Sequence, residues 1–221
     1  MREKIGKLIH RLGYVGLLLI IYLASKLFFR LKVKGKKNIP QNADDLVITS
    51  THTSYWDPPL IGITFGLLRK IHFIAREGLL KNPIFSLPVR TYSTTINRDD
   101  FGKNDLMNLL KAFKQKGPIC VFPEGTTSEN SPPKSGTVRL AEKTNRRFLP
   151  LKIEYGRSPT EFPFFFAPAE LTIGPPIDLE ELKRFSSGKE RPEATARDSS
   201  PNKKVDYQEL SIKLMDYIHQ L

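Results

Sequence analysis

Beyond Pro40 the chain alternates short runs of apolar and β-branched residues with longer amphipathic stretches. Each short run has the length and composition of a β-strand. We therefore expect strands at residues 46–50, 71–75, 93–97, 118–122, 148–154 and 170–174. Because alternating β and α elements form a mainly parallel central sheet flanked by helices, the sequence predicts a single α/β domain.

Two of the longer stretches carry clear helical stripes. Residues 103–116 place apolar side chains at i, i+3, i+4 and i+7, and Gly117 and Pro118 follow as helix-ending residues. Residues 207–221 carry a second stripe, formed by Tyr207, Leu210, Leu214, Tyr217, Ile218 and Leu221. Residues 186–204, in contrast, are rich in Ser, Pro, Glu and Lys without apolar periodicity, and they predict a mobile loop.

The N-terminal segment differs in kind from the rest. Residues 12–25 run without a charge, and apolar residues continue beyond them, interrupted by Lys26 and Arg30. A transmembrane helix needs about 20 predominantly apolar residues, and shorter stretches more often lie at the interface, so spanning and lying flat both stay open. No small-residue cleavage site follows, which argues against a signal peptide. We assign residues 1–37 to a basic-flanked apolar membrane helix and residues 38–221 to the globular domain.

Positive charge is concentrated in the same segment. The chain has a formal net charge of +12, and its first 37 residues hold ten basic side chains against one acid. The remainder is nearly balanced, which argues against a nucleic-acid-binding domain, whose basic residues would cover a folded face. Basic residues around an apolar helix are attracted to anionic headgroups by about 1 kcal/mol each. We expect a membrane-associated protein, at the cytoplasmic face of the inner membrane if its source is bacterial, with membrane lipids as partners and no obligate protein partner.

Cysteine and histidine exclude other classes of site. The chain has one cysteine, Cys120, so an intrachain disulfide is impossible. The four histidines show none of the close spacings of a metal site, and we expect no metal. Cys120 lies in an apolar run, which favours a core residue over a nucleophile.

The segment THTSYWDPP follows the first strand of the globular domain and carries His52 and Asp57. Five positions along a helix turn two side chains about 140° apart, so a contact between this pair requires a turn. Asp57 has a simpler interpretation as the N-cap of a helix that begins at Pro58. The two interpretations are compatible, because a capping aspartate can also orient a neighbouring imidazole.

Two further motifs fall at predicted strand ends, where ligands bind in parallel sheets. TINRDD places Arg98 there, and a guanidinium suits a phosphate group, although an ion pair with one of the two following aspartates is the simpler interpretation. CVFPEGTTS places Glu124, Gly125 and Thr126 on a tight loop, where glycine allows the backbone to approach a ligand closely. A turn with a capping threonine would give a similar pattern.

Taken together and in order, the segments STHTSYWDPPLIG, TINR, FPEGTTS, KSGTVRLA and LPLKI resemble the glycerolipid acyltransferase family that includes the 1-acylglycerol-3-phosphate acyltransferases. The resemblance covers roughly residues 38–175, so that the globular domain would be an acyltransferase domain. It implies that His52 and Asp57 are the catalytic pair and that Arg98 helps to hold the acceptor's phosphate. It also implies that Glu124, Gly125 and Thr126 shape the acceptor site.

The resemblance further implies a reaction. A fatty acyl group would pass from acyl-CoA or acyl carrier protein, as co-substrate, to the free hydroxyl of 1-acylglycerol-3-phosphate, giving phosphatidate for phospholipid synthesis without a cofactor. Neutral His52 would take the proton of the hydroxyl that attacks the thioester, and Asp57 would orient the imidazole. Direct transfer is expected because the chain has no G-x-S-x-G nucleophile elbow.

Two departures from the family pattern affect the acceptor. The family usually has Asn before the histidine, where this chain has Thr51, and commonly Arg after Gly-Thr, where this chain has Thr127. The missing arginine keeps a second hypothesis open, in which the acceptor is another lysophospholipid or glycerol-3-phosphate.

Two rival classes of protein would use the same residues differently. A lipid hydrolase could combine the His52 and Asp57 pair with Ser50 or Ser54 as nucleophile. A non-enzymatic lipid-binding protein would explain the N-terminal segment but would leave the pair without a purpose.

Overall fold

The computed structural model describes residues 12–13, 15–17, 19–66, 69–126, 131–157, 167–185 and 206–221. The strands are β1 (Lys32–Lys34), β2 (Leu46–Ser50), β3 (His72–Arg76), β4 (Ser93–Ile96), β5 (Ile119–Val121), β6 (Arg147–Tyr155) and β7 (Ala169–Ile173). The α-helices are α2 (Asp57–Thr64), α3 (Pro83–Tyr92), α4 (Lys103–Lys114), α5 (Gly136–Lys143), α6 (Leu179–Arg184) and α7 (Tyr207–His219). Shorter helical turns are η1 (Ser25–Phe29), η2 (Lys36–Asn38) and η3 (Glu77–Lys81).

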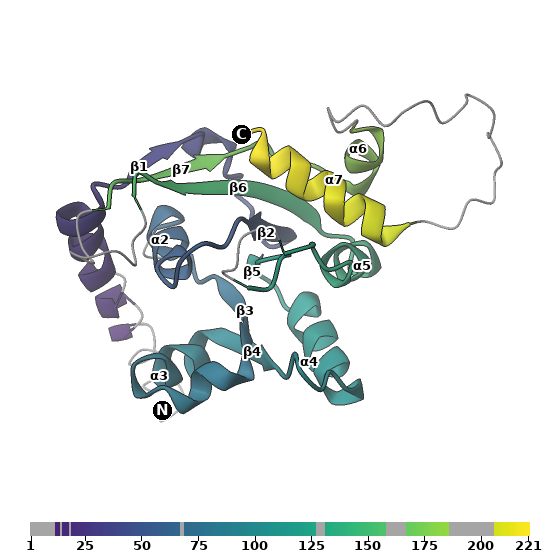
Figure 1. Cartoon of the computed structure of the whole chain (residues 1–221), viewed down its shortest axis with the longest axis horizontal. Coiled ribbons are helices and arrows are strands. Elements are labelled where there is room, and N and C mark those ends of the chain that lie inside the picture. The colour runs from purple at the N-terminus through teal and green to yellow at the C-terminus, as the bar shows by residue number, and fades with distance from the viewer. Residues whose placement is uncertain are drawn as a thin grey trace.

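One seven-stranded sheet, in the order β1-β7-β6-β2-β5-β3-β4, forms the centre of the domain (Figure 1). Each neighbouring pair from β6 to β4 is parallel. The chain reverses between β6 and β7, which pair antiparallel, and β1 then adds to β7 in parallel. The predicted α/β domain with a mainly parallel sheet flanked by helices is therefore confirmed.

Helices cover both faces of this sheet. In Figure 1, α4 to α7 lie on one side, and α2, α3 and the N-terminal helix lie on the other. Side chains alternate across the strands to fill both layers: Val47 packs under α4, α5 and α7, whereas Leu46 and Ile48 pack towards α2. All three side chains are fully buried. Strands that are buried on both faces are continuous apolar runs, and for this reason they can be predicted from the sequence.

The six predicted strands are confirmed to within one residue at each end. The predicted helices at 103–116 and 207–221 are confirmed as α4 and α7, each of which ends two residues earlier. The helix after His52 begins at Asp57 and not at Pro58, and it ends before Gly66, whose φ is 91°. The loop predicted at residues 186–204 lies outside the described residues.

Strand β1 and helices α3, α5 and α6 escape the sequence patterns. Strand β1 has three residues, two of them lysines, and forms because β7 offers it a free edge. Helix α3 begins at Pro83 and contains Pro88, a residue that normally interrupts helices. Helix α5 is eight residues long and follows a Pro-rich segment.

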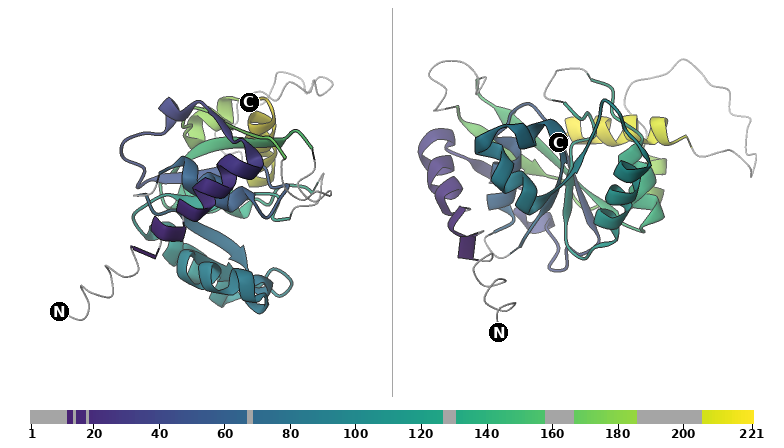
Figure 2. Two further views of the ribbon diagram at one scale, coloured as in Figure 1. Left: turned by 90° about the vertical axis from the view of Figure 1, so that its left-hand side faces the viewer. Right: turned by 90° about the horizontal axis from the view of Figure 1, so that it is seen from below.

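The N-terminal segment is helical at residues 12–13, 15–17 and 19–24, and η1 continues it to Phe29. Arg30 then adopts a left-handed conformation with φ of 43°, and the chain turns into β1. The segment assigned to a membrane helix therefore also contributes one strand to the sheet. Figure 2 shows this helix lying along one side of the domain. Within the described residues, none of the helices combines the length and the hydropathy that crossing a bilayer requires.

Candidate active site

Five neighbouring parallel strands end at one edge of the sheet, and a polar residue stands at or just after each end. In sheet order from β6 to β4 these residues are Tyr155, His52, Glu124, Arg76 and Arg98. The carboxyl ends of parallel strands are where ligands bind in open α/β sheets. The topology thus brings together all three motifs found in the sequence.

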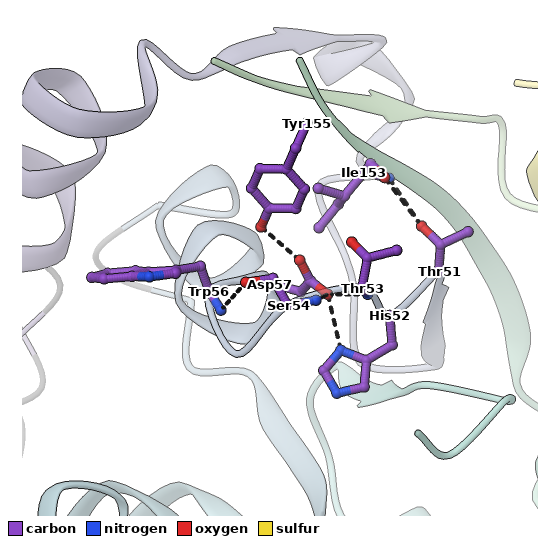
Figure 3. A network of polar contacts seen from close by, with 8 residues as sticks. All are labelled: Thr51, His52, Thr53, Ser54, Trp56, Asp57, Ile153 and Tyr155. Carbon is purple, nitrogen blue, oxygen red and sulfur yellow. Dashed lines mark hydrogen bonds and ion pairs between the residues drawn. The ribbon is translucent and has the colours of Figure 1, made fainter. Parts of the chain in front are cut away.

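His52 and Asp57 meet in the turn between β2 and α2 (Figure 3). The His52 Nδ1 atom lies 2.9 Å from Oδ2 of Asp57. The same oxygen accepts the backbone amides of Thr53 at 2.8 Å and Ser54 at 2.9 Å. Tyr155 donates its hydroxyl to the other oxygen, Oδ1, at 2.7 Å. The predicted contact through a turn is confirmed.

The interpretation of Asp57 as an N-cap is wrong. Trp56 occupies the N-cap position and makes no side-chain capping bond, and Asp57 is the first residue of α2. Its carboxylate bonds the preceding turn, because the chain there folds back towards the side chain. Asp57 is fully buried, so these donors take the place of water around its charge.

The imidazole of His52 is held on two sides. Asp57 faces Nδ1, so Nδ1 carries the proton and Nε2 is the basic nitrogen. The ring of Phe122 stacks on the imidazole, with centroids 4.1 Å apart and an interplanar angle of 22°. The side chain of His52 is 15% exposed. Figure 3 shows its second nitrogen pointing away from Asp57, and His52 lines a cavity of about 750 Å³.

This cavity has a polar and an apolar part. The polar part is lined by His52, Arg98, Gly125, Thr126 and Lys134. The apolar part lies between the N-terminal helix, α2 and α3, and its lining includes Leu17, Ile21, Pro59, Phe85 and Val89. Its size falls within the roughly 300–1,000 Å³ of ordinary ligand sites. Such a cavity suits an amphiphilic ligand with a long apolar chain.

Arg98 faces the cavity, and its pKa is lowered by burial and by the neighbouring charge of Arg76. The simpler interpretation of Arg98, an ion pair with a following aspartate, is not what the salt bridges show. The carboxylate of Asp99 pairs with Arg76 at 2.6 Å. A guanidinium stays protonated at any accessible pH, so Arg98 presents a cation to the cavity.

The loop after β5 turns at Gly125, where φ is 72°. A Cβ atom there would lie 3.5 Å from Nη1 of Arg98, and the positive φ disfavours any side chain. Gly125 and Thr126 line the cavity, but Glu124 is not among its lining residues. Burial raises the pKa of Glu124, whereas the backbone amide of His52 and the His219 side chain lower it. Glu124 thus faces the backbone of the turn that carries His52 and Asp57.

Three further residues at this site lie outside the predicted set of site residues. Arg76 and Lys134 line the cavity as further cations, and Tyr155 binds Asp57. Lys134 is placed by its backbone, because its amide donates to the Pro123 carbonyl at 2.9 Å. Position at a strand end could have drawn attention to Arg76 and Tyr155, but nothing local marks Lys134.

Alternative nucleophiles are poorly placed. Ser50 is fully buried, and Ser54 is buried with its hydroxyl accepting the Trp56 amide at 3.1 Å. Cys120 is buried, and burial together with the charge of Asp57 raises the pKa of its thiol. A thiol held protonated in the core is a poor nucleophile.

The fold and the site define an α/β enzyme with a buried histidine–aspartate pair beside an amphiphilic cavity. The family model described as "Acyltransferase" matches residues 30–154, and the chain belongs to this family. It is an acyltransferase similar to enzymes named for 1-acylglycerol-3-phosphate acylation.

Two such relatives cover most of the chain. The 1-acyl-sn-glycerol-3-phosphate acyltransferase of Bacillus subtilis is 29% identical over 163 residues, which are 72% of this chain and 79% of the relative. The crystal structure of the 1-acyl-sn-glycerophosphate acyltransferase PlsC from Thermotoga maritima superposes with a TM-score of 0.55 at 28% identity. That comparison covers 76% of this chain and 74% of the other.

Proposed function

We propose that this enzyme transfers a fatty acyl group from acyl-CoA or acyl carrier protein to the free hydroxyl of 1-acylglycerol-3-phosphate, giving phosphatidate. The observation that carries the proposal is the contact of His52 with Asp57, together with the place of His52 in the wall of a cavity that cationic and apolar side chains line together. A thioester carbonyl and an acceptor hydroxyl can meet beside a base in such a cavity. The names of the two relatives support the same acceptor.

His52 acts as the general base in this mechanism. Its Nε2 takes the proton of the acceptor hydroxyl while the oxygen attacks the thioester carbonyl. The tetrahedral intermediate then collapses, the carbon–sulfur bond breaks, and the leaving thiolate takes the proton from His52. Asp57 keeps Nδ1–H directed at itself and stabilises the imidazolium that forms in between.

The cations of the cavity bind the phosphate of the acceptor. Arg98 offers a planar fork of donors, which matches phosphate oxygens bidentately. Lys134 lies close to Arg98 at Gly125, since a Cβ atom on this glycine would be 3.5 Å from Nη1 of Arg98 and 3.7 Å from Cε of Lys134. Lys134 thus supplies a positive charge beside Gly125, two positions along the chain from where the family commonly has arginine. This arrangement supports a phosphomonoester acceptor despite the missing arginine.

The apolar part of the cavity holds an acyl chain. Its walls are aliphatic and aromatic side chains of three elements, and the N-terminal helix supplies Leu17 and Ile21. The N-terminal helix thus closes part of the cavity. The region that binds the acyl chain therefore lies next to the helix that we expect at the membrane.

The N-terminal helix lies on the membrane surface in this proposal. Large apolar side chains on it point to solvent, namely Leu12, Leu19, Ile20, Leu23 and Leu27. Lys26 and Arg30 flank them and can reach headgroups while their stems stay apolar. An amphipathic helix of this kind buries its apolar face at the interface and brings the cavity to its lipid substrate.

Transfer of labelled palmitate from palmitoyl-CoA to lysophosphatidate by detergent-solubilised enzyme tests the proposal, with lysophospholipids of larger headgroup as competing acceptors. We expect phosphatidate from the wild type and a loss of at least about 10³-fold in kcat for His52→Ala. His72→Gln is the matched control, because His72 is half-buried and bonds Thr94 on β4. Turnover that survives His52→Ala contradicts the mechanism, and free fatty acid as the main product points to a hydrolase.

A further inference from the structure

The hydroxyl of Tyr155 contacts the catalytic pair from a distant part of the sequence. Tyr155 ends β6, and its donation to Asp57 closes a hydrogen-bonded row of Tyr155, Asp57 and His52 (Figure 3). The register between β2 and β6, in which Ser50 pairs with Leu151, places Tyr155 within reach of Asp57. Just beyond the strand, the Thr51 hydroxyl accepts the Ile153 amide at 3.1 Å.

The hydroxyl of Tyr155 donates to Asp57 and also bonds the Ser54 side chain. Burial, followed by the charge of Asp57, raises the pKa of Tyr155 far above its usual range. The phenol therefore stays protonated at neutral pH, and its O–H donates to the carboxylate.

Neighbouring rings hold the Tyr155 side chain in place. Phe29 is fully buried and packs edge-on against Tyr155, with centroids 6.2 Å apart. It also packs against Trp56, the residue before Asp57, at 4.9 Å. Phe29, at the end of the N-terminal helix, thus contacts two neighbours of Asp57, namely Tyr155 and Trp56. Fixed aromatic packing of this kind keeps a hydrogen bond in one geometry.

We propose that Tyr155 is a positioning residue whose hydroxyl shares Asp57 with His52 and thereby limits how strongly the carboxylate retains a proton on the imidazole. A carboxylate that accepts another hydrogen bond has less charge to offer the imidazolium. A general base works only in its unprotonated form. Tyr155 therefore keeps His52 competent at a lower pH than Asp57 alone would allow. The inference rests on the proposed role of His52 as the base.

Other ionisable groups also surround the pair. The charges of His52 and Asp57, and that of His219 on α7, all influence the pKa of Glu124. Cys120 lies buried near Asp57, and Arg98 and Lys134 line the same cavity as His52. None of these groups is altered when a single tyrosine loses its hydroxyl, so Tyr155→Phe removes only the bond to Asp57 and the neighbouring contact with the Ser54 side chain.

The test is the pH profile of kcat/KM for full-length Tyr155→Phe, together with an NMR titration of His52 labelled at Cε1. Tyr207→Phe is the matched control, because Tyr207 also donates to a carboxylate, that of Glu142, at a site exposed to solvent. We expect the acid limb and the His52 titration midpoint to move up by about half a pH unit or more. The kcat/KM of Tyr155→Phe is then about threefold below that of the wild type at pH values under the acid limb, and nearly the same as the wild type above it. Thermal melts verify that each variant is folded.

Several outcomes decide the proposal. An equal fall in kcat/KM at every pH, with an unmoved His52 midpoint, shows that Tyr155 is merely structural and overturns it. A shift of the same size in Tyr207→Phe overturns it as well. If the wild type transfers no acyl group, the proposed function fails, and the NMR titration alone then tests the link from Tyr155 to His52. Phe29→Leu is a second variant, which loosens the ring and should shift the midpoint in the same direction.

Discussion

Asp57 is fully buried, and its Oδ2 atom lies 2.9 Å from Nδ1 of His52. Its replacement by Asn removes the charge but keeps the shape. We expect Asp57→Asn to lower kcat by about 10³- to 10⁴-fold, because the imidazolium loses its partner and the imidazole its fixed tautomer. Acyl transfer from palmitoyl-CoA measures the effect.

The control for this variant is Asp45→Asn, at an exposed carboxylate that pairs with Arg147 and does not line the cavity. Its kcat should stay within a few-fold of the wild type, because an exposed ion pair contributes little. An Asp57→Asn enzyme with nearly normal kcat means that the pair is structural.

The turn between His52 and Asp57 could be predicted because both residues lie in one short segment, where helix geometry forbids their contact. The strands could be predicted because burial on both faces makes them apolar throughout. Tyr155 could not be predicted in this way. It reaches Asp57 only because β6 lies next to β2, and the order of strands in a sheet is not written in local patterns.

Local sequence patterns also fail to reveal some residues of the cavity. Arg98 was marked by its position after a strand, whereas Lys134 lies in an irregular segment that is held by long-range hydrogen bonds. Gln208 and Ser211 of α7 bond the carbonyls of Pro133 and Lys134, respectively. A helix at the end of the chain thus helps to place a cation in the site, which no pattern within residues 131–135 could indicate.

Lys134 should matter for binding of the acceptor more than for chemistry. We expect Lys134→Met to raise KM for lysophosphatidate about tenfold, with kcat changed less, since one charge-assisted contact to phosphate is lost. Lys143→Met, at an exposed lysine of α5, is the matched control. An unchanged KM for lysophosphatidate removes Lys134 from the phosphate site.

The length of the acyl chain should depend on Val89, a buried residue of α3 that lines the apolar part of the cavity. Val89→Phe shortens the space available to the chain, and we expect the preferred acyl-CoA to shorten by two or more carbons, as a rough estimate from the added ring volume. Competition between acyl-CoA species of graded length measures the preference. Leu106→Phe, at an exposed position of α4, should leave it unchanged. An unaltered preference in Val89→Phe places the acyl chain elsewhere.

Membrane binding should depend on the exposed face of the N-terminal helix. Ile20 is 67% exposed and Leu23 is 60% exposed. We expect Ile20→Glu combined with Leu23→Glu to weaken sedimentation with anionic vesicles by about tenfold or more, since each side chain loses about 1.5–3 kcal/mol of burial in lipid. Ile212→Glu on α7 is the control. Turnover in detergent should persist in both, and undiminished vesicle binding by the double variant contradicts the flat-lying helix.

Arg146 should contribute more to stability than any surface charge. It is buried, and its guanidinium donates to the carbonyls of Leu46, Phe113, Gln115 and Gly117, which join the end of α4 to β2. We expect Arg146→Met to lower the free energy of unfolding by about 3 kcal/mol, because buried carbonyls lose their donor. The neighbouring Arg147, which pairs with Asp45 at 2.7 Å and is 43% exposed, gives the control. Arg147→Met should cost under about 1 kcal/mol. Equal urea midpoints for the two variants contradict the role of Arg146 as the buried link between α4 and β2.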